Sequence, residues 1–133
     1  MKDRAKPVCF TMPIEKTIAR KWLPRKNQIA LVELFAPIAA VETFGHLMQG
    51  KKIIFMIDSE SALGALVKGY SDREDMCELV GLFWKQIAQL DILTYLDRVP
   101  TDCNPADDPS RNDMSIAEYL GWVIADPIIP IEV

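Results

Sequence analysis

Three groups of carboxylates stand where acids could do chemistry. Glu33 lies early in a helical pattern, and Asp58 directly follows five apolar residues. Asp107 and Asp108 lie in a loop punctuated by prolines. Carboxylate oxygens are the hard ligands that Mg²⁺ prefers in octahedral geometry. Two such ions about 4 Å apart would activate water and stabilise the leaving oxygen of a phosphodiester, so the candidate chemistry is metal-assisted hydrolysis.

Each acid also has an ordinary structural interpretation. Glu33 could be a surface acid of its helix, and Asp58 could cap the next helix alongside Ser59. Asp107 or Asp108 could be an acid at a helix start, where the helix dipole favours negative charge. Position alone leaves both interpretations open at each residue.

A long helix must position Glu33. The segment from Asn27, a suitable N-cap, to Gly50, a suitable C-cap, predicts about six helical turns. Pro37 lies inside this segment and is expected to bend the helix. One apolar stripe follows three- and four-residue steps, with Gly45 filling the step that lacks an apolar side chain; its members are Leu31, Leu34, Ile38, Val41 and Met48.

A strand must position Asp58. The apolar run from Ile53 to Ile57 predicts a strand buried on both faces. Asp58 would then emerge at the carboxyl edge of a parallel sheet, where α/β proteins bind ligands. Two helices are expected to follow, one capped by Ser59 and one capped by Ser71 that runs from about residue 72 to 90.

The remaining elements complete an α/β pattern. Strands are predicted over residues 6–12 and about 91–99, the second closed by Pro100, and an amphipathic stretch over 116–123. The tail after residue 125 contains two prolines and predicts a packed extension or an edge strand. This order indicates one domain over residues 1–133, with a mixed, mostly parallel sheet flanked by helices.

Composition and charge bound the partners. The 133 residues are half apolar and about a quarter charged, and the three cysteines have no metal-finger spacing. No apolar run reaches the ~20 residues of a membrane span, and no signal-peptide pattern opens the chain. We expect an intracellular protein, cytoplasmic or nuclear, with organelle import left open. Residues 1–26 hold eight basic and two acidic residues, against seven and 17 in the remainder, which suits either phosphate binding or a solvated basic face.

Four ordered segments carry a family resemblance. QIALVELFAPIAAVETF, GKKIIFMIDSESALGALVKGYS, FWKQIAQLDI and RVPTDCNPADDPSR resemble the ribonuclease H domain of retroelements that carry a reverse transcriptase. The resemblance covers residues 28 to about 111 and leaves 112–133 as a C-terminal extension. It implies a three-layer ribonuclease H-like fold that binds RNA–DNA hybrids and hydrolyses their RNA strand with Mg²⁺ or Mn²⁺, in a two-ion site.

The resemblance assigns roles to the acids. Glu33 matches the family's helix glutamate, Asp58 its strand-end aspartate and Asp107 its last metal-ligating aspartate, with Asp108 as the adjacent alternative ligand. Ser59 stands where many relatives have asparagine, and Arg98 where relatives often have tryptophan.

The front of the chain departs from the family. Relatives begin with a strand that carries a first metal-ligating aspartate, whereas only MKDRA precedes the first predicted strand here. Three explanations are open: the chain is a fragment of a longer, polymerase-bearing polyprotein, it is a genuinely shortened relative, or another chain supplies the strand. A tail strand with Asp126 is a remoter option. Losing such a ligand removes most of the rate. The alternative is therefore a catalytically inactive structural or interaction module.

Overall fold

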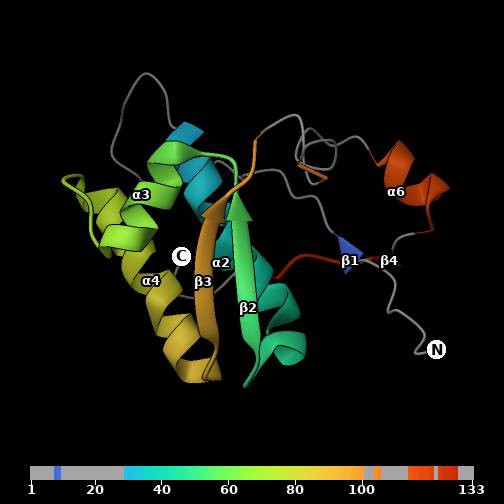
Figure 1. The fold of residues 1–133 in the computed structure, drawn as a ribbon, viewed down its shortest axis with the longest axis horizontal. Helices are drawn as coiled ribbons and strands as arrows, with labels where there is room; N and C mark the ends of the chain where they lie inside the picture. The colour runs from blue at the N-terminus through green and yellow to red at the C-terminus, as the bar shows by residue number, and fades with distance from the viewer. Residues whose placement is uncertain (1–7, 10–28, 101–103, 106–113, 122, 129–133) are drawn as a thin grey trace.

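The computed structural model describes residues 8–9, 29–100, 104–105, 114–121 and 123–128 (Figure 1). Within these ranges the chain has a mixed α/β architecture, which confirms the predicted class. The elements in chain order are β1 (Val8–Cys9), α2 (Ile29–Met48), β2 (Lys52–Ile57), α3 (Glu60–Lys68), α4 (Glu74–Leu90), β3 (Leu93–Arg98), α6 (Ser115–Tyr119) and β4 (Val123–Ile124).

Strands β2 and β3 form a parallel pair. Their register runs from Lys52 opposite Leu93 to Ile57 opposite Arg98, so both carboxyl ends meet at one edge, as expected. Helices α3 and α4 make the crossover that a parallel pair requires. A second parallel pair joins β1 to β4, with Val8 opposite Val123.

Helix α2 confirms the predicted stripe. Leu31, Leu34, Ile38 and Val41 are all buried, and the helix continues through Pro37 to Met48. Gly50 follows with a φ of 71°, the left-handed conformation expected after a helix. The predicted N-cap, Asn27, lies outside the described residues.

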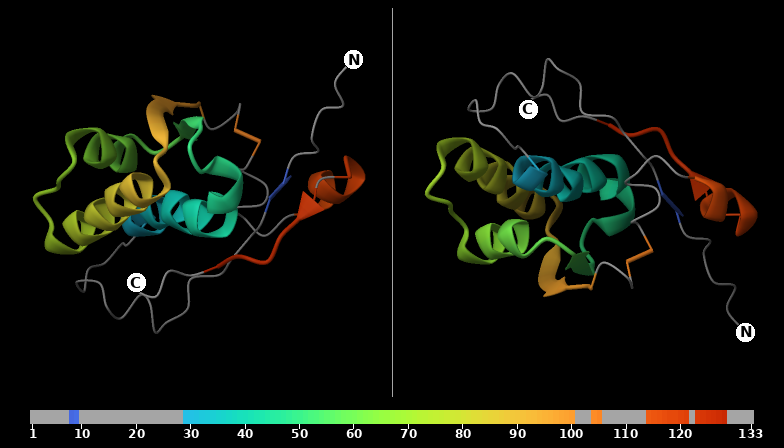
Figure 2. Two further views of the ribbon diagram at one scale, coloured as in Figure 1. Left: turned by 90° about the horizontal axis from the view of Figure 1, so that it is seen from below. Right: turned by 90° about the horizontal axis from the view of Figure 1, so that it is seen from above.

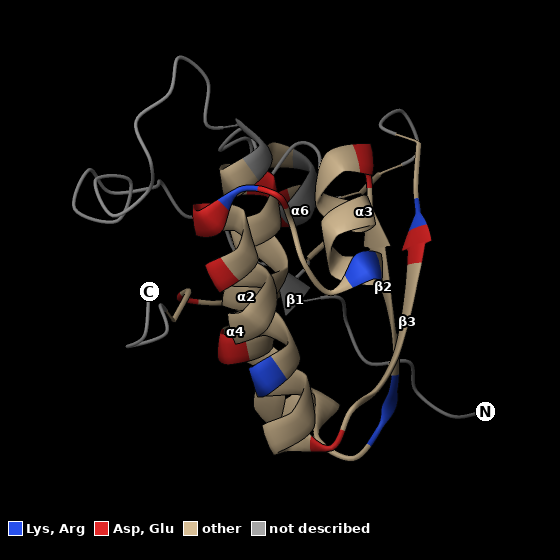
Figure 3. Ribbon diagram, turned by 90° about the vertical axis from the view of Figure 1, so that its left-hand side faces the viewer, with Lys and Arg blue, Asp and Glu red and all other residues tan. Residues whose placement is uncertain are grey.

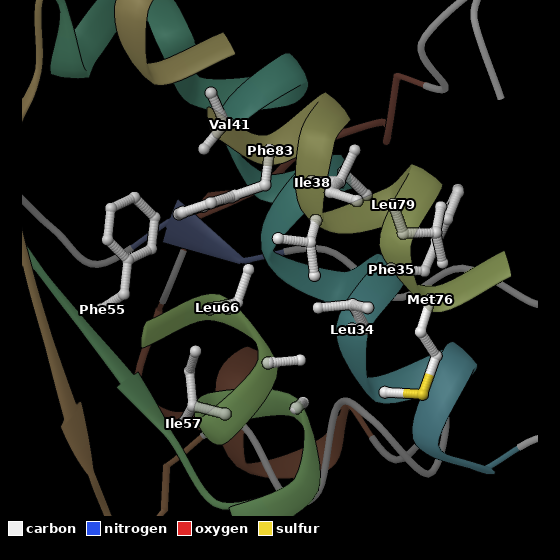
Figure 4. Packing of buried hydrophobic residues seen from close by; sticks show 14 of the residues in the cluster. Leu34, Phe35, Ile38, Val41, Phe55, Ile57, Leu66, Met76, Leu79 and Phe83 are labelled. Atoms are coloured by element: carbon white, nitrogen blue, oxygen red, sulfur yellow. The ribbon is translucent and has the colours of Figure 1, made fainter. Parts of the chain in front are cut away.

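The core lies between α2, α4 and the inner face of β2 (Figure 4). Phe83 of α4 is fully buried, and its ring meets that of Phe55 on β2 edge to face, with centroids 5.3 Å apart. Such aromatic pairs contribute about 0.5–1.5 kcal/mol beyond the area that they bury. Helices and sheet are therefore held together by one continuous apolar cluster.

The described helices cover one face of the β2–β3 pair, and the exposed side chains of β2 correct the prediction of a strand buried on both faces. Phe55 and Ile57 point into the core, whereas Ile54 is 64% and Met56 51% exposed. Figure 3 shows α2, α3 and α4 on the same side of β2 and β3. A continuous apolar run predicts burial on both faces, but no described element covers the second face.

The start of α4 also differs from the prediction. Ser71 Oγ accepts a hydrogen bond from the Arg73 N–H within the preceding turn. The N-cap is Arg73, which makes no capping bond with its side chain. Glu74 and Asp75 in the first turn supply the negative charge that stabilises a helix start.

The C-terminal segment packs against α2 on the side away from the sheet (Figure 2). The Ile128 N–H donates to Thr43 Oγ1 at 2.9 Å, consistent with the expected packed extension. Because β4 pairs with β1, the segment before Asp126 does not replace a strand beside β2.

Helix α2 is more apolar than expected. Residues Leu31–Met48 are long and apolar enough, by length and composition alone, to cross a membrane, and 44% of that window is buried inside the fold. The same composition suits the central helix of a packed domain.

Candidate functional site

Asp58 lies where β2 ends, at the carboxyl edge of the parallel pair. Its side chain is half-buried. Asn104 Nδ2 donates to Asp58 Oδ2 at 3.0 Å, which links Asn104 to the end of β2. Only one of the two carboxylate oxygens accepts this bond.

The capping role belongs to the next residue. Ser59 is the N-cap of α3, and its Oγ accepts from the Ala62 N–H at 3.2 Å. Asp58 is therefore not the residue that caps α3, and the ordinary interpretation of Asp58 as a cap is wrong. Its carboxylate is directed to the loop instead.

Glu33 belongs to the same end of the fold. Helix α2 begins at the end toward which the arrowheads of β2 and β3 point (Figure 1), and Glu33 lies in its first two turns. The side chain is half-buried. Because Pro37 has no N–H, the Glu33 carbonyl lacks its usual donor four residues on.

The structure does not describe the third predicted ligand. Asp107 and Asp108 lie outside the described residues, three and four positions after Asn104. Among the described residues, no group of three or more His, Cys, Asp or Glu side chains could hold a metal ion. The described part of the site therefore consists of the Asp58–Asn104 pair, with Glu33 on the element that begins nearby.

Asn104 is the residue that the sequence argument missed. It stands in the NPAD element, but an asparagine before proline is also an ordinary turn residue. The only available signal was its place in the same short motif as Asp107. Its bond to Asp58 joins residues 46 positions apart, a distance that no local pattern encodes.

An ion pair borders the site. Arg98, at the end of β3, contacts Glu60 in the first turn of α3 at 2.7 Å. Both side chains are more than half exposed, so the pair contributes at most about 1 kcal/mol. Arg98 thus ties the end of β3 to the first turn of α3.

A shallow depression lies next to this ion pair. It has a volume of about 380 Å³ and is bounded by α3 and the turn before α4. Lysine, arginine and both acidic residue types line it together, so it presents no single sign of charge. Its polar lining includes Glu60, Ser61, Lys68, Ser71, Asp72 and Arg73.

Comparison with known proteins finds no matching family model, no similar curated protein and no similar solved structure.

Proposed function

We propose that this chain is a ribonuclease H-like nuclease domain of a retroelement reverse transcriptase. It would hydrolyse the RNA strand of RNA–DNA hybrids with Mg²⁺ or Mn²⁺. The observation that carries the proposal is the hydrogen bond from Asn104 to Asp58, because it brings the first residue of the NPAD motif to the end of β2. Two segments that resemble the family at distant positions thus meet at one point.

The proposed ligands are Glu33, Asp58 and Asp107, with Asp108 as the alternative to Asp107. A half-buried carboxylate at a strand end suits a metal ligand, since one oxygen can bind the ion while Asn104 holds the other. Bound ions would supply an activated water and charge stabilisation for the leaving oxygen. The basic residues within 16–26 would lie near the nucleic acid.

The three-layer ribonuclease H-like fold is part of the proposal. The parallel β2–β3 pair with its helical crossover is compatible with it. The family's first strand and its aspartate would come from upstream polypeptide, such as a polymerase domain, or from another chain.

The test is cleavage of a labelled RNA–DNA hybrid by this chain in Mg²⁺ or Mn²⁺. Asp58→Asn should reduce cleavage by at least about a hundredfold, because it removes a charged ligand of the ions. Asp91→Asn is the matched control: it makes the same chemical change at the opposite end of the sheet. Asp91 is exposed and has a φ of 52°, which asparagine also adopts readily.

Equal cleavage by Asp58→Asn and the wild type would remove Asp58 from the mechanism. Absence of metal-dependent cleavage, in the chain alone and in a longer chain that includes the upstream segment, would favour the inactive structural or interaction module.

A further inference from the structure

Arg98 is the described cation that the sheet register places beside Asp58. It ends β3 opposite Ile57, the residue before Asp58, and the next N–H, that of Val99, donates to the Ile57 carbonyl at 3.1 Å. Paired strands lie about 5 Å apart, so the backbones of Arg98 and Asp58 are neighbours. The other lysines and arginines of the described ranges belong to the opposite end of β2, to α3 and α4, or to the turn between these helices; they are Lys51, Lys52, Lys68, Arg73 and Lys85.

An acidic site that handles a polyanion needs a cation beside it. Metal ions at Asp58 would neutralise the phosphate that reacts, but a nucleic acid also brings the phosphates on either side of it. Contacts from lysine and arginine to such phosphates supply much of the affinity of proteins for nucleic acids. A guanidinium suits this role because it can donate two parallel hydrogen bonds to one phosphate.

Glu60 holds Arg98 in the free protein. Arg98 Nη1 lies 2.7 Å from Glu60 Oε1, and both side chains are more than half exposed. Ion pairs in such positions are weak because water screens them, whereas a bidentate bond to phosphate is among the stronger charged contacts. The guanidinium can therefore exchange one anion for another without disturbing the core. Glu60 keeps its place in the first turn of α3, whose start is capped by Ser59.

We propose that Arg98 binds a backbone phosphate of the RNA–DNA hybrid next to the metal site, and that Glu60 holds Arg98 until the nucleic acid displaces it. Glu60 thus competes with the substrate and lowers its affinity. The inference rests on the proposed function: it assigns that site a further substrate-binding residue and an internal competitor for this residue.

The first test measures binding of a labelled RNA–DNA hybrid to the full chain in Ca²⁺ over a salt series, with a check that the RNA strand stays intact. Arg98→Gln should weaken binding by about tenfold at low salt and reduce the salt slope by about 1, because one phosphate contact is lost. Arg98→Lys keeps the charge without the paired donors, so it should restore the slope but bind more weakly than the wild type.

Arg73→Gln is the matched control. It makes the same chemical change at an exposed arginine that lies beyond the far end of α3 and forms no ion pair with any described residue. Because salt screens a distant charge, this variant should change binding by less than about twofold at physiological salt and leave the slope unchanged.

A second test locates the contact on the nucleic acid. In a series of hybrids, one linkage at a time is replaced by a neutral methylphosphonate. One position should weaken binding to the wild type and have no further effect on Arg98→Gln, since the two changes remove the same interaction. A structural role of Arg98 would instead leave the two effects additive at every position.

The competitor is tested by Glu60→Gln. Freeing Arg98 should raise affinity for the hybrid by about two- to fivefold, the range that loss of an exposed ion pair allows. Glu78→Gln, the same change at an exposed glutamate of α4, should raise it by less than about twofold.

The inference and the proposed function can fail separately. Cleavage of the hybrid in Mg²⁺ with Arg98→Gln binding no more weakly than Arg73→Gln would overturn the role of Arg98 and keep the nuclease. Equal affinities of Glu60→Gln and Glu78→Gln would overturn the role of Glu60. Loss of binding in Arg98→Gln, in a chain that never cleaves the hybrid, would support the phosphate contact and contradict the nuclease. A wild type that does not bind the hybrid would overturn both.

Discussion

Gln86 is a buried polar side chain that joins two helices. Its Nε2 donates to the Ile38 carbonyl at 3.1 Å and to Glu42 Oε2 at 3.0 Å, linking α4 to α2. Its Oε1 is buried and has no partner among the described residues. Buried side-chain amides normally form hydrogen bonds with all their polar atoms. Gln86 therefore stabilises the α2–α4 pair through Nε2, while its unbonded Oε1 carries the cost of a buried acceptor.

We expect Gln86→Ala to lower the free energy of unfolding by about 2 kcal/mol, through two lost hydrogen bonds and a cavity. Glu42→Ala, at an exposed residue, should cost less than about 1 kcal/mol. Urea denaturation of both variants measures the difference. Equal losses would show that the bond to the Ile38 carbonyl and the packing of the buried Gln86 side chain make no net contribution.

Asn104 allows the metal hypothesis to be tested through stability. Asn104→Asp places a second carboxylate beside Asp58, where the two charges repel each other in the absence of metal, at a cost of about 1–2 kcal/mol. Mg²⁺ should recover much of this loss, because a ligand that binds only the folded state stabilises it. Thermal melting in chelator and in Mg²⁺ measures the effect. Asn104→Ala is the control and should lose stability without regaining it in Mg²⁺.

At the scale of elements, α2 and α4 approach closely at Gly45. A Cβ built there would lie 2.9 Å from Leu90 Cδ1, whereas one at Gly81 on α4 meets nothing within 4 Å. Both glycines lie inside helices, so alanine would bring the same gain in helix propensity at each position. Only the contact with Leu90 differs.

Gly81→Ala should therefore stabilise the protein by about 1 kcal/mol. Gly45→Ala should gain less, or lose stability, because Leu90 must move, and Gly45→Val should lose about 1–3 kcal/mol by overpacking. Thermal or urea unfolding of the three variants gives the ranking. Equal stabilisation by both alanines would mean that Leu90 adjusts freely.

The elements were predicted well where local pattern decides them. The apolar stripe of α2, the Ser59 cap and the glycine after α2 are local signals, and each is confirmed. Ser71 was misassigned because serine stabilises turns and helix starts through the same hydroxyl. The position of Asp58 at a strand end could be predicted from the apolar run before it. Its hydrogen bond to Asn104 could not, because that bond depends on how two segments distant in the sequence come together. The predicted position of Asp107 remains a prediction.

At the scale of the whole molecule, the sheet leaves an apolar face exposed. Ile54 lies opposite Tyr95 in the β2–β3 register, and both are more than half exposed, as are the neighbouring Met56 and Leu93. Contiguous apolar surface of this kind promotes association. The sequence predicted burial on both faces because an apolar run does not show whether helices cover one face of a sheet or both.

Replacing Ile54 and Tyr95 together by threonine should reduce self-association while changing the free energy of unfolding by only about 0.5 kcal/mol, since threonine suits an exposed strand position. Light scattering over a concentration series, with urea unfolding alongside, tests this. Unchanged scattering would show that this face does not drive association.

The parallel pairing of β2 with β3 has a consequence for synthesis. Each paired residue meets a partner about 40 positions later in the chain, so β2 is made well before β3. At ~5–20 residues per second, β2 waits about 2–8 s for its partner strand. During that interval the apolar run of β2 is exposed on both sides, at a point where chaperone binding would compete with aggregation.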